Sequence, residues 1–163
     1  MILDKIRIGF GFDTHRLEKG DGLFIGGISV KSPFSAIGHS DADVLLHAIC
    51  DALLGAANLG DIGVHFSNKD DRWKGIRSTK LLEITNTLIK EKGFSIVNID
   101  SCISLELPKI VHKRNEMQSV ISNILEISTD RISIKATTNE KLGFIGRNEG
   151  ISAYANVLLY LND

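Results

Sequence analysis

Apolar and polar residues alternate along several stretches of the chain, as is typical of β-strands with one buried face. A short stretch over residues 23–30 predicts a hairpin, because Gly26 and Gly27 can form a two-residue turn. Longer stretches predict strands over residues 5–15, 94–107, 131–138 and 151–161. The faces expected to be buried are Ile6, Ile8, Phe10 and Phe12 in the first strand, Val97, Ile99, Ile103, Leu105 and Leu107 in the second, Ile132, Ile134 and Ala136 in the third, and alternate residues from Ile151 to Leu161 in the last.

Three other stretches have apolar residues three and four positions apart, which predicts helices. The first is apolar on most sides and extends to about Ala57, with Ser40 as its expected N-cap and Asp43 three residues further on. The other two helices are expected over residues 78–92 and 112–125.

The order of these elements predicts an α+β fold with a sheet of about four long strands. We expect the helices to pack on one face of this sheet and the short hairpin to lie outside it. Residues 60–75 are expected to form a long polar loop, which in a compact domain is often functional. The 163 residues are enough for one core, so we expect a single domain over residues 1–163.

Composition narrows the choice of function. The net charge is −1, with 19 basic and 20 acidic residues, so no basic excess indicates nucleic-acid binding. The two cysteines, Cys50 and Cys102, lie far apart in apolar surroundings, which favours reduced thiols. Neither an N-terminal signal nor a membrane-spanning run is visible, so we expect a cytoplasmic protein with no membrane partner.

Asp13 and His15 lie two apart on the first predicted strand, so their side chains share one face of it. His39, Asp43, His47 and Asp51 are each four apart and predict one stripe of the first helix. Asp13 and His15 could be neighbours by chance, and His47 alone could be a helix histidine with an ordinary partner. Together, however, imidazoles and carboxylates on a strand end and a helix stripe favour an open divalent-metal site.

A second polar segment, residues 135–147, directly follows a predicted strand. The hydroxyls of Thr137 and Thr138 could bind phosphate oxygens, Glu140 could hold a Mg²⁺-like ion, and Arg147 adds positive charge. A solvated turn explains this segment about equally well. Gly9 and Gly11 lack the third glycine and the helix of a dinucleotide-binding fingerprint, and no P-loop or serine nucleophile motif is present.

Taken together, these segments resemble the 2-C-methyl-D-erythritol 2,4-cyclodiphosphate synthase family along essentially the whole chain. The resemblance is carried by residues 9–15, Gly26-Gly27, 39–48, 51–57, 59–63, Pro108-Lys109, 135–144 and 146–150. It implies a substrate, 4-diphosphocytidyl-2-C-methyl-D-erythritol 2-phosphate, whose 2-phosphate attacks the β-phosphorus and expels CMP. It also implies a homotrimer with its sites between neighbouring subunits, which is compatible with the apolar residues on both faces of the last strand.

The resemblance also implies roles for individual residues. Asp13, His15 and His47 match the zinc ligands, Glu140 matches a ligand of a second divalent ion (Mg²⁺ or Mn²⁺), and His39 and Thr138 match the transition-state stabilisers. The residues expected to contact the substrate are Asp13, Thr14, His15, His39, Ser40, Asp61, Ile62, Gly63, Phe66, Asp70, Leu105, Glu106, Leu107, Pro108, Lys109, Ile110, Val111, Thr137, Thr138, Asn139, Glu140, Phe144 and Arg147. Among these, residues 105–111 with Thr137 match the cytidine pocket.

Two other functions share the metal residues. A zinc-dependent phosphate-ester hydrolase would use Asp13, His15 and His47 with a metal-bound water. A non-enzymatic module would use the zinc only to hold its fold. Structural zinc sites are usually four-coordinate and rich in cysteine, and these three candidates include none, which argues against the second alternative.

Overall fold

The computed structural model describes residues 2–163, and it contains a five-stranded sheet in the order β4-β1-β7-β5-β6. All neighbouring strands are antiparallel except β5 and β6, which are parallel. The strands of this sheet are β1 (Ile6–Lys19), β4 (Phe34–Ile37), β5 (Phe94–Ser104), β6 (Ile132–Thr137) and β7 (Gly150–Leu161). A separate hairpin joins β2 (Gly22–Ile25) to β3 (Ile28–Lys31) through the predicted Gly26-Gly27 turn.

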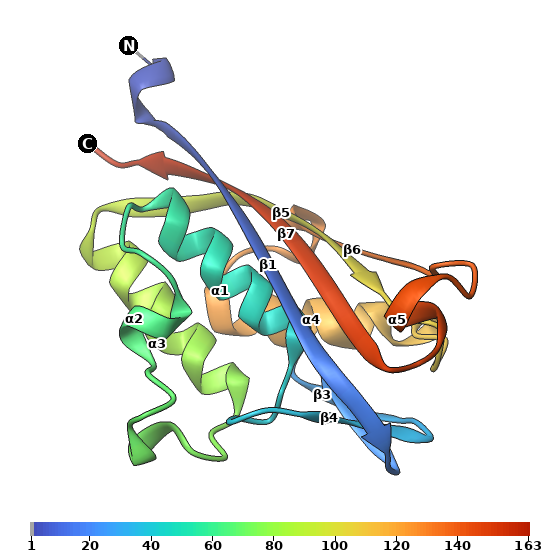
Figure 1. Ribbon diagram of the computed structural model, residues 1–163. Coiled ribbons are helices and arrows are strands. Elements are labelled where there is room, and N and C mark those ends of the chain that lie inside the picture. Colours follow the sequence, from blue (N-terminus) through green and yellow to red (C-terminus); the bar gives the residue numbers. More distant parts are fainter. Residues whose placement is uncertain (1) are drawn as a thin grey trace.

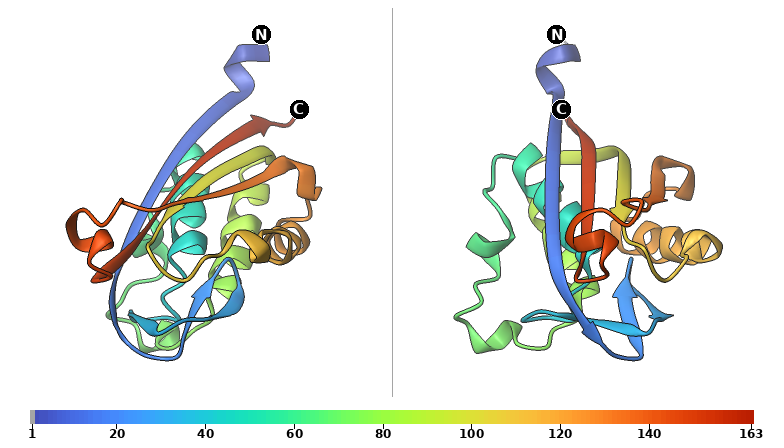
Figure 2. Two further views of the ribbon diagram at one scale, coloured as in Figure 1. Left: turned by 90° about the vertical axis from the view of Figure 1, so that its right-hand side faces the viewer. Right: turned by 45° about the vertical axis from the view of Figure 1, so that its right-hand side comes forward.

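The helices are α1 (Val44–Ala56), α2 (Ile62–His65), α3 (Ser78–Glu91), α4 (Arg114–Leu125) and α5 (Gly143–Gly146). Single 3-10 turns cover Ile2–Lys5, Asp71–Trp73, Val111–Lys113 and Thr129–Arg131. The long helices α1, α3 and α4 lie together on one face of the sheet (Figure 1; Figure 2, left), which confirms the predicted α+β arrangement. None of the described helices is both long enough and apolar enough to cross a membrane.

Helix α1 packs directly on β1 because two glycines remove the side chains between them. A Cβ atom at Gly9 would lie 1.9 Å from the carbonyl oxygen of Ala52, and one at Gly11 would lie 1.9 Å from that of Ala48. The face of β1 that meets the helix is therefore Gly9, Gly11 and Asp13. The backbones of the strand and the helix come close enough to place Asp13 beside His47 on α1.

The expectation that Ile8, Phe10 and Phe12 are buried was wrong. These side chains point away from α1 and are 76%, 62% and 47% exposed. They belong to the helix-free face of the sheet, which we call the open sheet face. The half of this face over β1 and β7 is mainly apolar, with Phe12 packed against Tyr154, although Asn156 also lies there opposite Phe10. The half over β5 and β6 carries the ion pair between Lys135 and Asp100.

Other local differences have local causes. Val97 is 38% exposed because the register of β5 against β7 shifts between Ile96 and Asn98, which brings Ile96 and Ile99 to the core. Leu107 is 43% exposed because it lies beyond the end of β5. The predicted polar loop over residues 60–75 contains α2 and a 3-10 turn, and the short edge strand β4 was not predicted.

The first helix begins later than predicted. Its N-cap is Asp43, whose side chain accepts a hydrogen bond from the backbone N–H of Leu46, so Ser40 does not cap it. The same carboxylate accepts from the N–H groups of Gly26 at 2.9 Å and Gly27 at 2.7 Å. Asp43 thus joins the hairpin turn to the start of α1. His39 consequently lies in the loop before the helix instead of on its surface.

Candidate metal centre and pockets

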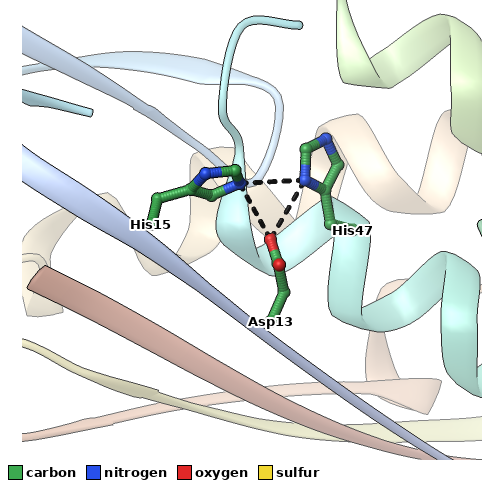
Figure 3. Close-up of side chains that lie close together, drawn as sticks. All are labelled: Asp13, His15 and His47. Carbon is green, nitrogen blue, oxygen red and sulfur yellow. Dashed lines mark hydrogen bonds and ion pairs between the residues drawn. The ribbon is translucent and has the colours of Figure 1, made fainter. Parts of the chain in front are cut away.

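Asp13, His15 and His47 meet at one point between β1 and α1 (Figure 3). Asp13 Oδ2 lies 2.9 Å from His15 Nε2 and 3.0 Å from His47 Nδ1, and the two ring nitrogens are 3.1 Å apart. Tetrahedral ligands about 2.0–2.1 Å from one zinc ion lie about 3.3 Å from each other, so this triangle fits a small divalent cation with slight expansion. Among residues 2–163, this is the group of His, Cys, Asp and Glu side chains arranged closely enough to hold a metal.

Both rings are oriented by a partner on their far side. His15 Nδ1 lies 3.0 Å from the carbonyl oxygen of Ile37, which can only accept a hydrogen bond. The proton of neutral His15 is therefore on Nδ1, and the lone pair of Nε2 points at the cluster. His47 Nε2 lies 2.8 Å from Ser78 Oγ and 3.1 Å from Ser40 Oγ, leaving its Nδ1 toward Asp13.

The charges of the three groups support one another. Burial alone would raise the pKa of the Asp13 carboxyl. Without a metal, however, protons on the ring nitrogens of His15 and His47 that face Asp13 donate hydrogen bonds to it and hold that pKa well below its usual range. Burial also opposes a charged His15, yet the hydrogen bond and negative charge of Asp13 raise the pKa of His15 above its ordinary value. A divalent cation would replace the protons on the ring nitrogens that face Asp13, and its positive charge would then stabilise the Asp13 carboxylate.

The triad opens into a cavity of about 360 Å³. Its lining includes the predicted site residues His39, Ser40, Ile62, Gly63 and Phe66, with Gly38, Asn68, Trp73, Ile76 and Leu81. His39 Nε2 is buried and has no hydrogen-bond partner within the described chain. A buried polar atom without a partner is costly, so a ligand in this cavity would satisfy it.

The two other carboxylates of the predicted helix stripe have structural partners. Asp43 holds backbone N–H groups, as described above, and Asp51 accepts from the N–H of Ile62 at 2.7 Å. Asp61 caps α2 by accepting from Val64 N, and Asp70 forms an ion pair with Arg72. None of the four belongs to the metal cluster.

A second group of predicted residues forms a smaller pocket of about 130 Å³. It is lined by Leu105, Pro108, Lys109, Ile110, Val111, Ala136, Thr137 and Thr138. Beside it, the Thr138 hydroxyl donates to Glu140 Oε1 at 2.8 Å. The turn that carries Glu140 is held by Glu106, whose Oε1 accepts from the N–H groups of Asn139 at 3.0 Å and Lys141 at 3.2 Å. Leu107 is exposed next to this group.

The structure does not bring all predicted residues into one site. The lining of the triad cavity and that of the smaller pocket have no residue in common. Thr14 points to the other side of β1 from Asp13, where its hydroxyl meets that of Ser152 at 2.7 Å. Phe144 lines a third hollow with Thr14, and Arg147 pairs with Glu149 nearby.

Sequence reasoning missed Ser78, Trp73, Ile76 and Leu81 as part of the site. Trp73 lies in the stretch predicted to be a loop, and Ile76 lies between that loop and the next predicted helix. Trp73 contacts Phe66 edge-on with ring centroids 5.2 Å apart. Ser78 reaches His47 from 31 positions away in the chain. No local spacing marks such a contact, because it depends on how α3 packs against α1.

Comparison with known proteins identifies the family of this chain. A family model described as the YgbB family matches residues 6–160. The 2-C-methyl-D-erythritol 2,4-cyclodiphosphate synthase of Cytophaga hutchinsonii is 54% identical over 155 residues, covering 95% of this chain and 98% of that protein. The protein of the same name from Bacteroides fragilis is 55% identical with the same coverage.

Solved structures agree as well. IspF of Plasmodium falciparum in complex with CDP is 34% identical with a TM-score of 0.86, and the match covers 98% of both chains. The bifunctional IspDF of Campylobacter jejuni is 40% identical with a TM-score of 0.93, and the match covers 98% of this chain but 43% of that one. The family match and these relatives show that the chain belongs to the YgbB family, whose members include these 2-C-methyl-D-erythritol 2,4-cyclodiphosphate synthases.

Proposed function

We propose that this protein converts 4-diphosphocytidyl-2-C-methyl-D-erythritol 2-phosphate to 2-C-methyl-D-erythritol 2,4-cyclodiphosphate and CMP. The observation that carries the proposal is the triad of Asp13, His15 and His47 at the wall of a cavity, in a chain that belongs to this family. Two imidazoles and one carboxylate fit zinc, and a zinc ion held by these three side chains would have a further position open to a substrate oxygen. Bound there, zinc would neutralise negative charge on the reacting phosphates.

The reaction needs no protein nucleophile. An oxygen of the 2-phosphate forms a bond to the β-phosphorus, and the bond from that phosphorus to the oxygen of CMP breaks, with the electron pair leaving on CMP. The attacking phosphate is already an anion, so no general base is required. The protein's contribution is then to align the two phosphates and to stabilise their charge.

Three side chains are suited to that task. His39 is in the triad cavity with an unpartnered Nε2, so it could hydrogen-bond a phosphate oxygen. Thr138 lines the smaller pocket and Glu140 lies beside it, so the hydroxyl could contact the diphosphate and the carboxylate could hold Mg²⁺ or Mn²⁺. Ser40 and the 61–70 segment would surround the methylerythritol phosphate.

The smaller pocket would hold the cytidine. Residues 105–111 lie just beyond the end of β5, where backbone groups not used by the sheet could read the edge of a base. Lys109 would add positive charge near the α-phosphate. The CDP complex of the Plasmodium falciparum relative supports a cytidine nucleotide as the ligand class.

A homotrimer would join the two pockets. They share no lining residue within one chain, and the apolar half of the open sheet face exposes Ile8, Phe10 and Phe12. Packing this half against neighbouring copies would remove the aromatic rings from water. Each complete site would then combine the triad cavity of one subunit with the nucleotide pocket of the next.

Phe10→Asp should therefore dissociate the trimer, because each subunit would bury an unpaired carboxylate in place of a ring whose burial contributes about 1.5–3 kcal/mol. Light scattering coupled to size exclusion would report monomers, and activity should fall with assembly. Phe10→Leu, which keeps an apolar side chain, should remain trimeric and serves as the matched control. Wild-type protein that is active as a monomer would contradict the shared site.

Glu140→Gln should lower kcat by about 10²–10³-fold, as expected when one group that stabilises transition-state charge is lost. Because Glu140 lies outside the triad, the zinc content measured by elemental analysis should stay at the wild-type level. Activity of the wild type should fall on treatment with EDTA and return with Mg²⁺ or Mn²⁺. Undiminished turnover by Glu140→Gln without added Mg²⁺ would rule out this role.

The decisive experiment is a product assay. Purified protein, incubated with zinc, Mg²⁺ and the cytidyl substrate, should yield CMP and a cyclic diphosphate in equal amounts. Both products can be measured by ³¹P NMR. Release of inorganic phosphate without a cyclic product would instead identify a phosphate-ester hydrolase and overturn the proposal.

A further inference from the structure

We propose that Ser78 and Asp41 are positioning residues for the metal cluster, which keep the proton of neutral His47 on Nε2 and its lone pair on Nδ1. This inference rests on the metal site of the proposed function. It assigns a task to two residues outside the triad. They belong to different segments, the loop before α1 and the first turn of α3.

The contacts form a continuous chain from the cluster to a carboxylate. His47 Nδ1 lies 3.0 Å from Asp13 Oδ2, and the opposite ring nitrogen, Nε2, lies 2.8 Å from Ser78 Oγ. The Ser78 hydroxyl in turn makes a short hydrogen bond to Asp41 Oδ1. Ser78 is fully buried, so water does not compete for its hydroxyl.

The carboxylate fixes the direction of this chain. A carboxylate can only accept hydrogen bonds, so the single hydroxyl hydrogen of Ser78 must point to Asp41. Only the lone pairs of Ser78 Oγ are left for His47, which means that Nε2 must be the donor. A neutral imidazole with its proton on Nε2 has its lone pair on Nδ1, which is the state needed to bind a metal there.

Asp41 is itself held firmly. Its side chain is 5% exposed, and its second oxygen accepts from the N–H of Ser78 at 3.0 Å and from Arg77 Nε at 2.9 Å. The guanidinium of Arg77 and the first N–H of α3 thus fix the orientation of this carboxylate. Its own backbone N–H donates to the carbonyl of Ile76 at 3.1 Å, so main chain and side chain tie the two segments together.

Ser40 cannot supply the same direction. Its hydroxyl lies 3.1 Å from His47 Nε2 and also accepts from Ala42 N at 3.3 Å, but no carboxylate commits its hydrogen. The hydrogen of Ser40 is therefore free to point either way. This difference makes Ser40→Ala a matched control for metal affinity, because it removes a hydroxyl from the same ring nitrogen without touching Asp41.

The test measures zinc affinity by competition with a chromophoric chelator, which needs no substrate. Removing the hydrogen-bond partner of a metal-bound histidine typically weakens metal binding 10–100-fold. We expect a loss of this size in Ser78→Ala and in Asp41→Asn. Asp41→Asn has nearly the same shape, but its amide can donate to Ser78, whose hydroxyl can then donate to His47 Nε2. This permits the tautomer of His47 with its proton on Nδ1, as an Asp-to-Asn change does at a catalytic histidine held by an aspartate. Ser40→Ala should stay within about threefold of the wild type.

Two further measurements separate positioning from general damage to the fold. The thermal midpoint of each metal-free variant measures the general cost of losing a buried hydrogen bond. The further rise in midpoint on adding zinc should be smaller in Ser78→Ala and Asp41→Asn than in the wild type, because that rise reports metal binding alone. The visible spectrum of the Co²⁺-substituted protein should change in Ser78→Ala and Asp41→Asn but not in Ser40→Ala.

Wild-type zinc affinity and an unchanged Co²⁺ spectrum in both Ser78→Ala and Asp41→Asn would overturn the inference while leaving the proposed function intact. A wild-type protein that binds no zinc at all would overturn both. Equal losses in Ser40→Ala and Ser78→Ala would show that either hydroxyl serves, and would overturn the directing role of Asp41.

Discussion

Replacing His47 with alanine should remove bound zinc and abolish most of the activity while the protein remains folded. In the proposed site the imidazole is one of three ligands with Asp13 and His15, and no other described His, Cys, Asp or Glu belongs to this group. The charge stabilisation supplied by a catalytic metal amounts to several kcal/mol, so kcat/KM should fall by about a thousandfold or more. Elemental analysis and the product assay measure the two effects separately.

Stability offers an independent readout of the same change. Zinc that binds only the native state raises the free energy of unfolding by about 2.7 kcal/mol at a hundred times its dissociation constant. The wild type should show this increase on adding zinc, and His47→Ala should not. His112→Ala removes an exposed imidazole outside the cluster and should keep its zinc. Stoichiometric zinc in His47→Ala would falsify the assignment of this ligand.

Gly11→Ala should be among the most damaging small substitutions in the protein. The new Cβ would lie 1.9 Å from the carbonyl oxygen of Ala48 and 2.7 Å from the backbone nitrogen of Ala52. Both obstacles are main-chain atoms of a buried helix, which cannot rotate away as a side chain would. Overpacking a core commonly costs about 1–3 kcal/mol, and we expect a value at or above the upper end.

The damage should extend to the metal site. Gly11 precedes Asp13 by two residues on the same face of β1, and Ala48 follows His47 directly, so moving α1 outward separates the ligands. Denaturant unfolding and zinc affinity should both decline in Gly11→Ala. Gly55→Ala on the same helix is the matched control. Beyond its chain neighbours and the backbone of its own helix, no atom lies within 4 Å of the position of its Cβ, so Gly55→Ala should instead stabilise the helix by about 0.5–1 kcal/mol. A fully stable Gly11→Ala would show that the contact between β1 and α1 is looser than the structure indicates.

The alternation of β1 illustrates what a sequence can and cannot reveal. The pattern places Asp13 and His15 on one face and Phe10 and Phe12 on the other, and the structure has this division. The error concerned which face is buried, because a hydrophobicity pattern assigns the core to large apolar side chains. Here the core face is formed by glycines, whose contribution is the close approach of the helix backbone.

Contacts between distant segments limited the prediction of the site. The meeting of Asp13, His15 and His47 could be anticipated because a strand face and a helix stripe each have a fixed period. The position of Ser78 behind His47 could not, since it depends on the packing of α3 on α1. Asp43 and Asp51 were candidate metal ligands on the helix stripe. Their carboxylates instead accept hydrogen bonds from backbone N–H groups, and only the three-dimensional structure shows those partners.

The two ends of the chain leave the sheet together, where β1 begins and β7 finishes (Figure 1), and Lys5 forms an ion pair with Asp163 there. Asp13 is seven residues along β1 from Ile6, which at 3.3 Å per residue places it about 23 Å away. An affinity tag or a second enzyme attached at either end would therefore leave the mouth of the triad cavity open. The bifunctional IspDF of Campylobacter jejuni, of which the match covers 43%, is a relative whose chain extends well beyond this fold.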